Sequence, residues 1–416
     1  MFLKAAIRLK KKSELSHSRF LKKGAPWVFS NELQAFDKTL PPGSWVSLES
    51  ADGETLGYGF FNPHSLIAYR SFERASFRSE EQTRALFFKR VDAAWRLRVL
   101  AYGGSRSVRL TFGESDGLPG LITDLFESEK GGLAIIQCHS AGSDQLIYWM
   151  QQWLDQRLGI RSGVVRNDLD VRHREKAPLE VVEWGEIPSD VWAMEGGLRF
   201  YFDLKSGQKT GFFYDHRDNR LALAKRAAFL AHAPGSSTSA AALDCFSYVG
   251  AWGLALAKAN PKMKVVCLDV SKPALEMVLR NAAFNGLKDQ VEVLAADFFH
   301  DKKALENQKF QIVVSDPPSM SASAKHSDES RRAHERCFYQ SAKLLAPQGL
   351  AAFAACSYHL KWDEFMEICA RVGQSRNRSL VISHLGGQSA DHPVLSSLLE
   401  TRYLKCAFLE ELDSWS

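Results

Sequence analysis

The feature that most constrains the fold is an alternation of short apolar runs with helix-like segments in the second half of the chain. Strand-like runs occupy residues 242–246, 264–269, 291–295, 312–315, 349–356, 379–385 and 403–409. Helix-like segments lie between them, at residues 252–259, 273–285, 302–307, 328–345 and 361–372. Such alternation is typical of a parallel sheet with helices on both faces. We therefore predict that residues 189–416 form a Rossmann-like α/β domain with a seven-stranded, mostly parallel sheet.

The residues before this domain follow other patterns. Residues 1–75 contain short strand-like runs separated by turn signals such as Asp52-Gly53 and Asn62-Pro63, which indicates a small β domain. Residues 76–188 combine helical periodicity at 80–102 and 144–158 with strand-like runs at 108–112, 121–124 and 133–138. This mixture indicates a small α+β middle domain. A chain of 416 residues is long enough for two or three domains.

Composition narrows the class of protein. A hydrophobic content of 45% and a charged content of 24% are typical of a globular protein in water. We expect no membrane-spanning helix, because the chain has no run of about 18 apolar residues, and the N-terminus lacks the pattern of a signal peptide. The seven cysteines are scattered and never spaced as CxxC. This favours a cytoplasmic protein without a disulfide framework or a metal site.

The positive charge is concentrated at the N-terminus. The net charge is +5, and residues 1–23 carry eight lysines and arginines against one acid, Glu14. A basic segment of this kind neutralises phosphates, so we expect contact with a nucleic acid. The alternative is a solvated basic arm without a partner. The lysines expected to contact RNA are Lys10, Lys11, Lys12, Lys22 and Lys23.

Two reactive side chains follow neighbouring strands of the predicted sheet. Asp316 comes directly after the strand at 312–315, and Cys356 ends the strand at 349–356. In an open parallel sheet, ligands bind outside the carboxyl ends of the strands. A carboxylate and a thiol at one such edge favour chemistry on a flat, electron-poor ring. The alternative for Cys356 is a small buried side chain without a chemical role.

Acidic residues follow the first three strands of the same sheet. Asp244, Asp269 and Asp297 stand at successive strand ends, and Gly250 and Gly253 follow Asp244 in the first strand-to-helix turn. The turn lacks the GxGxxG pattern that seats a pyrophosphate. Asp244 in this turn suits a cationic ligand. Asp269, at the end of the second strand, suits a ribose diol, and Asp297, after the third strand, suits an adenine amino group. Each could be a solvated loop acid, but together they favour S-adenosylmethionine.

These stretches resemble a known family. LDCFSYVGAWG, CLDVS, AADFF and VVSDPPSM are similar to motifs I to IV of class I S-adenosylmethionine-dependent methyltransferases. GQKTGFFYDHRDNR, GAPWVFSNEL, FGESDGLPGLITD and SADHPV resemble segments of the PUA-containing bacterial methyltransferases of large-subunit ribosomal RNA. Three motifs depart from the family: Ser319-Met320 follows the DPP turn, Ala355 precedes the thiol, and LLETR precedes YLK.

The resemblance implies an N-terminal PUA-like domain, S-adenosylmethionine as cofactor, 23S ribosomal RNA as substrate and a homodimer as one form of the protein. It adds Lys209 and Arg217 to the residues expected at the RNA. The residues that it assigns to the cofactor are Thr210, Asp244, Phe246, Ser247, Tyr248, Gly250, Gly253, Asp269, Val270, Asp297, Phe298, Asp316 and Pro317.

The reaction that the resemblance implies is methylation of C5 of a cytosine. The Cys356 thiolate would add to C6 of the ring, which makes C5 nucleophilic. Asp316 would act as the acid at N3, given a raised pKa in a closed site. The group that removes the C5 proton stays open between Asp316 and a water, because Pro317 and Pro318 stand where related enzymes carry a second cysteine. His359 is a candidate to polarise the thiol.

Two other functions remain open at this point. The enzyme could methylate another base atom, such as guanine N7, which needs no thiol. Alternatively, the chain could be a noncatalytic RNA-binding assembly factor that retains the fold.

Overall fold

The computed structural model describes residues 3, 5–77, 79–204, 207, 210–232, 240–318, 320, 327–375 and 380–411. The chain divides into two compact units. The first comprises Met1–Val191, Gln208–Thr210 and Ala390–Thr401, and the second comprises Trp192–Gly207, Gly211–Ser389 and Arg402–Ser416. The predicted boundaries near residues 75 and 188 stay predictions. No helix of the described residues combines the length and apolar character needed to cross a membrane.

The N-terminal part of the first unit is a five-stranded sheet in the order β1-β3-β4-β5-β2. Its strands are β1 (Ala5–Arg8), β2 (Trp27–Val28), β3 (Ser44–Glu49), β4 (Thr55–Phe61) and β5 (Tyr69–Glu73). β1 is parallel to β3, and the other pairs are antiparallel. The short helix α1 (Arg19–Lys23) ends at Gly24 in the left-handed conformation. The predicted β domain is confirmed, and the described residues of the basic N-terminal segment include β1 and α1 of this domain.

The middle part of the first unit packs a long helix on a mixed sheet. Helix α2 (Glu80–Tyr102) begins after Ser79, whose hydroxyl accepts a hydrogen bond from the Gln82 backbone. The strands are β6 (Val108–Phe112), β7 (Leu121–Ser128), β8 (Leu133–Cys138), β9 (Gly163–Arg166) and β10 (Val181–Trp184). Helices α3 (Ile147–Leu158) and α4 (Asp170–Glu175) complete it. The sequence predicted α2, β6 and β8 at these bounds but did not indicate β9, α4 or β10.

The second unit contains a seven-stranded sheet in the order β15-β14-β13-β16-β17-β19-β18. The strands are β13 (Ala241–Cys245), β14 (Lys264–Asp269), β15 (Val291–Ala295), β16 (Phe310–Ser315), β17 (Leu345–Cys356), β18 (Leu380–Gly386) and β19 (Leu404–Glu411). The first five are mutually parallel, whereas β19 is antiparallel to both β17 and β18. The predicted seven-stranded, mostly parallel sheet is confirmed. The hairpin β11 (Val191–Glu195) and β12 (Leu198–Tyr201) precedes it.

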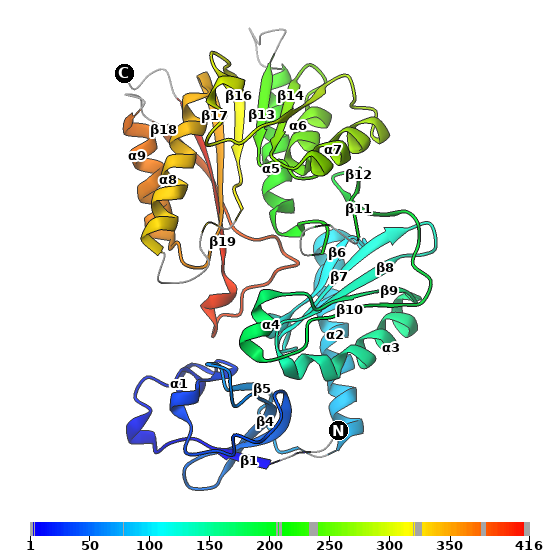
Figure 1. The fold of residues 1–416 in the computed structure, drawn as a ribbon, viewed down its shortest axis with the longest axis vertical. Coiled ribbons are helices and arrows are strands. Elements are labelled where there is room, and N and C mark those ends of the chain that lie inside the picture. Colours follow the sequence, from blue (N-terminus) through cyan, green and yellow to red (C-terminus); the bar gives the residue numbers. More distant parts are fainter. Residues whose placement is uncertain are drawn as a thin grey trace. The chain divides into compact units, whose positions relative to one another are not determined.

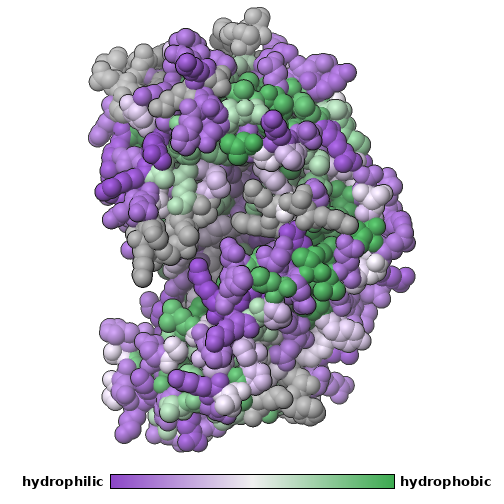
Figure 2. All heavy atoms as spheres, viewed as in Figure 1, coloured by the Kyte–Doolittle hydropathy of each residue, from purple (hydrophilic) through white to green (hydrophobic). Residues whose placement is uncertain are grey.

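Helices cover both faces of this sheet (Figure 1). Helices α8 (Ser327–Lys343) and α9 (Trp362–Ser375) lie on one face, and α5 (Arg217–His232), α6 (Ala251–Ala259) and α7 (Lys272–Phe284) lie on the other (Figure 1). On the first face, the rings of Phe338 and Phe353 stack with centroids 4.5 Å apart. The sequence did not predict α5, and the helix expected at 302–307 is one 3-10 turn, Lys302–Leu305. On the face drawn in Figure 2, hydrophilic residues predominate among the described residues, with hydrophobic patches between them.

Candidate active site

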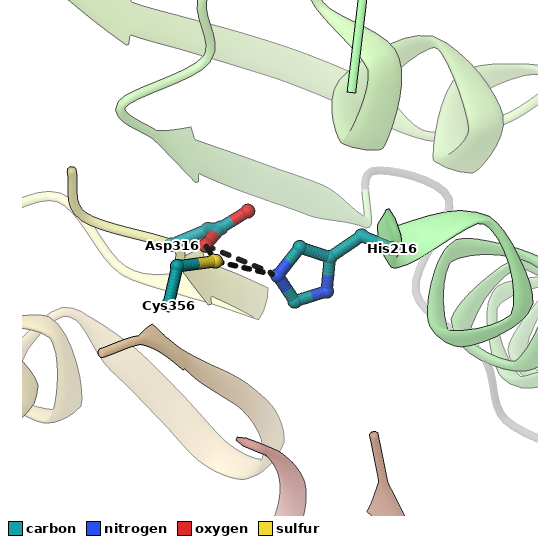
Figure 3. A group of neighbouring side chains, drawn as sticks. All are labelled: His216, Asp316 and Cys356. Atoms are coloured by element: carbon teal, nitrogen blue, oxygen red, sulfur yellow. Dashed lines mark hydrogen bonds and ion pairs between the residues drawn. The ribbon is translucent and has the colours of Figure 1, made fainter. Parts of the chain in front are cut away.

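Asp316 and Cys356 lie side by side at the carboxyl edge of the second sheet (Figure 3). β16 ends at Ser315 and β17 ends at Cys356, and these two strands are parallel neighbours. The thiol Sγ of Cys356 lies 4.0 Å from Oδ1 of Asp316. The two groups therefore meet at one edge, as the positions of the strand ends predicted.

A histidine completes the cluster. His216 stands in the 3-10 turn Tyr214–His216, directly before α5. Its Nε2 lies 3.5 Å from Cys356 Sγ and 3.4 Å from Asp316 Oδ1 (Figure 3). The sequence indicated His359 as a candidate for this place, but the histidine beside the thiol in the described part of the chain is His216. No spacing signal indicated it, because 140 residues separate it from Cys356.

The other ring nitrogen of His216 faces an amide group. Nδ2 of Asn219 lies 3.2 Å from His216 Nδ1 and donates a hydrogen bond to the Gly387 carbonyl at 2.9 Å. An amide nitrogen only donates, so we assign Nδ1 as the acceptor and place the ring proton on Nε2. The three side chains are spaced closely enough to share a metal ion. However, a ligating histidine normally donates its other N–H to an acceptor, and the amide nitrogen of Asn219 does not fit that role.

Asp316 loses its proton more readily than a carboxyl in ordinary surroundings. Its Oδ2 accepts a hydrogen bond from Trp252 Nε1 at 3.1 Å. Burial opposes the charged form, but the charge and hydrogen bond of His216 and the hydrogen bond of Trp252 outweigh it, so the pKa of Asp316 is lowered. The expected raised pKa is therefore wrong. The pKa of this carboxyl depends on the side chains around it, which are Trp252 of α6 and His216 of the segment before α5.

Cys356 is the accessible thiol of this chain. All seven cysteines are described, none forms a disulfide, and Cys356 alone is partly exposed while the other six are buried. Burial raises the pKa of Cys245 well above its usual range, which fits a thiol that only packs in the core. Cys356 is therefore not fully buried, and its catalytic role stays a prediction.

A buried lysine lies on the strand beside the thiol. Lys405 in β19 is 2% exposed, and its Nζ donates to the carbonyls of Ser357 at 2.6 Å and Tyr403 at 3.2 Å. Burial lowers the pKa of Lys405 to about 8, and the charge of Cys356 acts in the opposite direction. The lysine therefore provides positive charge near the thiol at neutral pH.

The first strand-to-helix turn presents unpaired polar atoms. Oδ2 of Asp244 accepts a hydrogen bond from the Gly253 backbone at 2.9 Å, whereas its Oδ1 is buried without a partner. The Ser247 hydroxyl is likewise buried without a partner. Burial raises the pKa of Asp244 to about 8. A buried carboxyl oxygen and a hydroxyl that lack partners fit a polar, cationic ligand such as S-adenosylmethionine.

The backbone of this turn is unusual. Phe246 and Tyr248 have φ angles of +64° and +49°, which side chains other than glycine seldom adopt. Such strained positions cluster at ligand sites. Gly250 begins α6 with a φ of +85°. The Tyr248 hydroxyl donates to the Gly211 carbonyl at 3.0 Å.

The other two strand-end acids accept hydrogen bonds from the backbones of nearby loops. Asp269 accepts hydrogen bonds from the backbones of Tyr248 and Ser271, both at 2.9 Å. Asp297 accepts from the backbones of Phe299 at 2.8 Å and His300 at 3.1 Å, and it pairs with the His300 side chain. The alternative that these acids only stabilise loops therefore has support at both positions. Their cofactor roles stay predictions.

The remaining predicted cofactor residues have different surroundings. Val270 is 67% exposed, whereas Phe298 is 7% exposed and packs its ring on Phe246 at a centroid distance of 5.3 Å. Pro317, next to Asp316, is buried. Thr210 is buried and belongs to the first unit. These four roles also stay predictions.

The residues predicted at the RNA separate into two groups. Lys11, Lys12, Lys22 and Lys23 are exposed and Lys10 is partly exposed. Arg217 is 3% exposed and lies 3.5 Å from Glu195, so little of its side chain is accessible to RNA, and its contact with RNA stays a prediction. Lys209 lies outside the described residues.

The sheet order, the polar turn after β13 and the reactive edge at β16 and β17 define the class of S-adenosylmethionine-dependent methyltransferases. Residues 224–373 match the model of the methyltransferase small domain, and residues 7–74 match that of a PUA-like domain. The chain is 31% identical over 394 residues to the ribosomal RNA large subunit methyltransferase I of Vibrio cholerae, which covers 92% of this chain and 95% of that protein. The protein of the same name from Shewanella denitrificans is 31% identical over 412 residues, covering 96% and 98%. The chain belongs to this family.

Solved structures support the fold. A SAM-dependent methyltransferase from Streptococcus mutans aligns with a TM-score of 0.75 at 16% identity, covering 98% of this chain and all of that one. A methyltransferase complexed with SAH aligns with the same score, identity and coverage. Identity at this level supports the shared fold only. Together with the matches above, the fold makes this protein an S-adenosylmethionine-dependent methyltransferase.

Proposed function

We propose that the protein transfers a methyl group from S-adenosylmethionine to C5 of a cytosine in 23S ribosomal RNA, through a temporary covalent bond between Cys356 and the base. The observation that carries the proposal is the pairing of a partly exposed thiol with a carboxylate at 4.0 Å, at the edge where ligands of such sheets bind. The name that the relatives share supports large-subunit ribosomal RNA as the substrate.

The thiol is needed because C5 of cytosine is a poor nucleophile. When Sγ of Cys356 bonds to C6 and N3 takes up a proton, C5 becomes the carbon of an enamine and can attack an electrophile. S-adenosylmethionine supplies the methyl group. The base must leave its stack to reach the thiol, as in other enzymes that modify bases.

The lowered pKa of Asp316 changes its role from the one first expected. An ionised Asp316 first accepts the proton of the Cys356 thiol through Oδ1, the oxygen nearest to Sγ. It passes that proton to N3 while the S–C6 bond forms, and it is a carboxylate again. We assign removal of the C5 proton to the same Oδ1 atom, since Trp252 holds Oδ2. The thiolate then leaves C6, the C5=C6 double bond returns, and the N3 proton goes back to sulfur. Asp316 releases the C5 proton to water and is a carboxylate again.

The exposed lysines of the N-terminal sheet domain support RNA binding. Lys22 and Lys23 stand in α1, and Lys11 and Lys12 are exposed beside it. We propose that these lysines contact phosphates, whereas Arg217 does not. Replacing Lys22 and Lys23 by alanine should reduce the slope of log affinity against log salt by about 1 to 2. An unchanged slope would place the RNA elsewhere.

Product analysis tests the proposed function. Full-length 23S ribosomal RNA without modifications is incubated with the enzyme and S-adenosylmethionine, digested to nucleosides and examined by mass spectrometry. We expect 5-methylcytidine from the wild type and none from Cys356→Ala. A methylated guanosine or a methylated base amine would support the other enzymatic function. RNA binding without any methylation would support an assembly factor.

A further inference from the structure

We propose that His216 is the hydrogen-bond donor that stabilises the Cys356 thiolate, and that Asn219 orients the ring so that the Nε2–H faces the sulfur. His216 thus does not serve as the base that takes the thiol proton. This inference rests on the proposed function for the step that the thiolate performs, and it gives that step a residue that the sequence did not indicate.

The orientation of the Asn219 amide carries the assignment. Its Nδ2 reaches the Gly387 carbonyl at 2.9 Å, a contact that only a donor can make with a carbonyl oxygen. On its other side, Oδ1 packs so closely against Gly386 that a Cβ there would come within 1.9 Å of it. The amide is therefore enclosed, and its second N–H points at His216 Nδ1, 3.2 Å away.

This contact disfavours a ring that acts as a base through Nε2. A base at Nε2 must be free of its proton there, so a neutral ring would carry its proton on Nδ1 instead. That proton would face the Asn219 N–H, and the hydrogen bond to Asn219 would be lost. His216 is 2% exposed, so water cannot replace this hydrogen bond.

The distances favour the sulfur of Cys356 as the acceptor of the Nε2–H of His216. The Nε2 to Sγ distance of 3.5 Å is ordinary for an N–H···S hydrogen bond, whereas 3.4 Å to Asp316 Oδ1 is long for N–H···O. Asp316 has its own donor in Trp252. The ring is also fixed in place, since it packs on the Trp252 ring at a centroid distance of 5.3 Å.

Two charged groups also lie near the thiol. Asp316 approaches it from the end of β16, and Lys405 lies on the neighbouring strand β19. His216 also lowers the pKa of Asp316, and this effect of its charge is lost in both His216→Gln and His216→Phe. A comparison of these two variants at a single pH consequently isolates the contribution of the N–H donor.

Alkylation of Cys356 by iodoacetamide tests the proposal without RNA or methyl transfer. The six buried cysteines give little background, and Cys356→Ser measures it. Two variants are compared with the wild type: His216→Gln keeps an N–H donor but cannot act as a base, and His216→Phe keeps a ring without a donor. Rates are measured at pH 7 and at pH 9.5 on the full-length protein, and binding of S-adenosylmethionine by calorimetry shows that each variant is folded.

At pH 7 we expect His216→Phe to react about tenfold more slowly than the wild type, while His216→Gln keeps most of the rate. At pH 9.5, where thiols are largely ionised, the three rates should converge. Equal losses of alkylation rate in both variants at pH 7 would show that His216 acts as a base and would overturn the proposal. Unchanged rates in both variants would overturn it as well. A loss that persists at pH 9.5 would indicate altered access to the thiol and would also overturn it. Failure to find 5-methylcytidine would instead contradict the proposed function and leave this result untouched.

Discussion

Asp244 is a buried carboxyl whose protonation distinguishes the folded protein from the unfolded chain. Its side chain is 0% exposed, with one oxygen bonded to the Gly253 backbone and the other unpaired. Burial, together with the nearby Asp316 and Asp269 charges, raises its pKa to about 8, against about 3.9 in an unfolded chain. The folded protein therefore retains this proton over a pH range in which the unfolded chain has lost it.

The sign of the effect on stability follows from linkage. The contribution of Asp244 is fully present below about pH 4 and is lost as the pH rises through about 8. Asp244→Asn cannot lose this proton, so its free energy of unfolding should improve relative to the wild type between pH 5 and pH 8, by roughly 1 kcal/mol per pH unit at most. Denaturant unfolding at each pH, without cofactor, measures the difference.

An exposed acid provides the control for this experiment. Asp289→Asn removes a carboxyl on the surface, and its difference from the wild type should stay constant over the same pH range. If the difference for Asp244→Asn were also constant, Asp244 would be ionised in the folded protein.

Single residues also mark the limit of what the sequence could predict. Asp316 and Cys356 were identifiable because each ends a strand, and strand order brings such ends together. His216 was not identifiable, since it reaches the thiol only after the segment before α5 folds over the sheet edge. The pKa of Asp316 and the burial of Arg217 depend on side chains that no local pattern specifies.

At the scale of elements, α6 packs closely on the sheet at a glycine, Gly253. A Cβ at Gly253 would come within 2.5 Å of Cys267 Sγ and 3.3 Å of Asp244 Oδ2. The backbone of Gly253 also donates to Asp244. The helix can therefore approach β13 and β14 closely only without a side chain at this position.

Gly253→Ala should weaken this packing and the binding of S-adenosylmethionine together. We expect a loss of about 1 to 3 kcal/mol in stability and at least a tenfold weaker affinity for the cofactor in calorimetry. Gly373→Ala in α9 is a matched control, because its Cβ would meet Leu380 no closer than 3.6 Å. That variant should be neutral or slightly more stable. Equal behaviour of the two variants would contradict the role given to Gly253.

Elements with a strong hydrophobic period were predicted well. The bounds of α2, β14 and β15 match the sequence-based ranges, because each has a clear period and clear ends. α5 was missed because its sequence, rich in alanine and charge, follows an aromatic segment that gave no helix-start signal. The short connection at Lys302–Leu305 shows that a helical pattern of a few residues does not ensure an α-helix.

At the scale of the whole molecule, the order of elements determined the fold before any side chain was placed. Alternating strands and helices permit few topologies other than a doubly wound sheet, and the structure has one. The antiparallel β19 could not be read from periodicity, because parallel and antiparallel buried strands have similar patterns. The division into two compact units, with Ala390–Thr401 returning to the first, was likewise beyond the sequence.

The central claim is that Cys356 forms a covalent bond with cytosine, and trapping tests it most directly. Ribosomal RNA containing 5-fluorocytidine is incubated with the full-length enzyme and S-adenosylmethionine, because fluorine at C5 cannot leave as a proton does and the adduct persists. The account predicts a complex that survives denaturing electrophoresis, disappears in Cys356→Ala and remains in Cys369→Ala, which alters a buried cysteine of α9. Full methylation activity in Cys356→Ala, or methylation of cytosine without any trapped complex in the wild type, would contradict it.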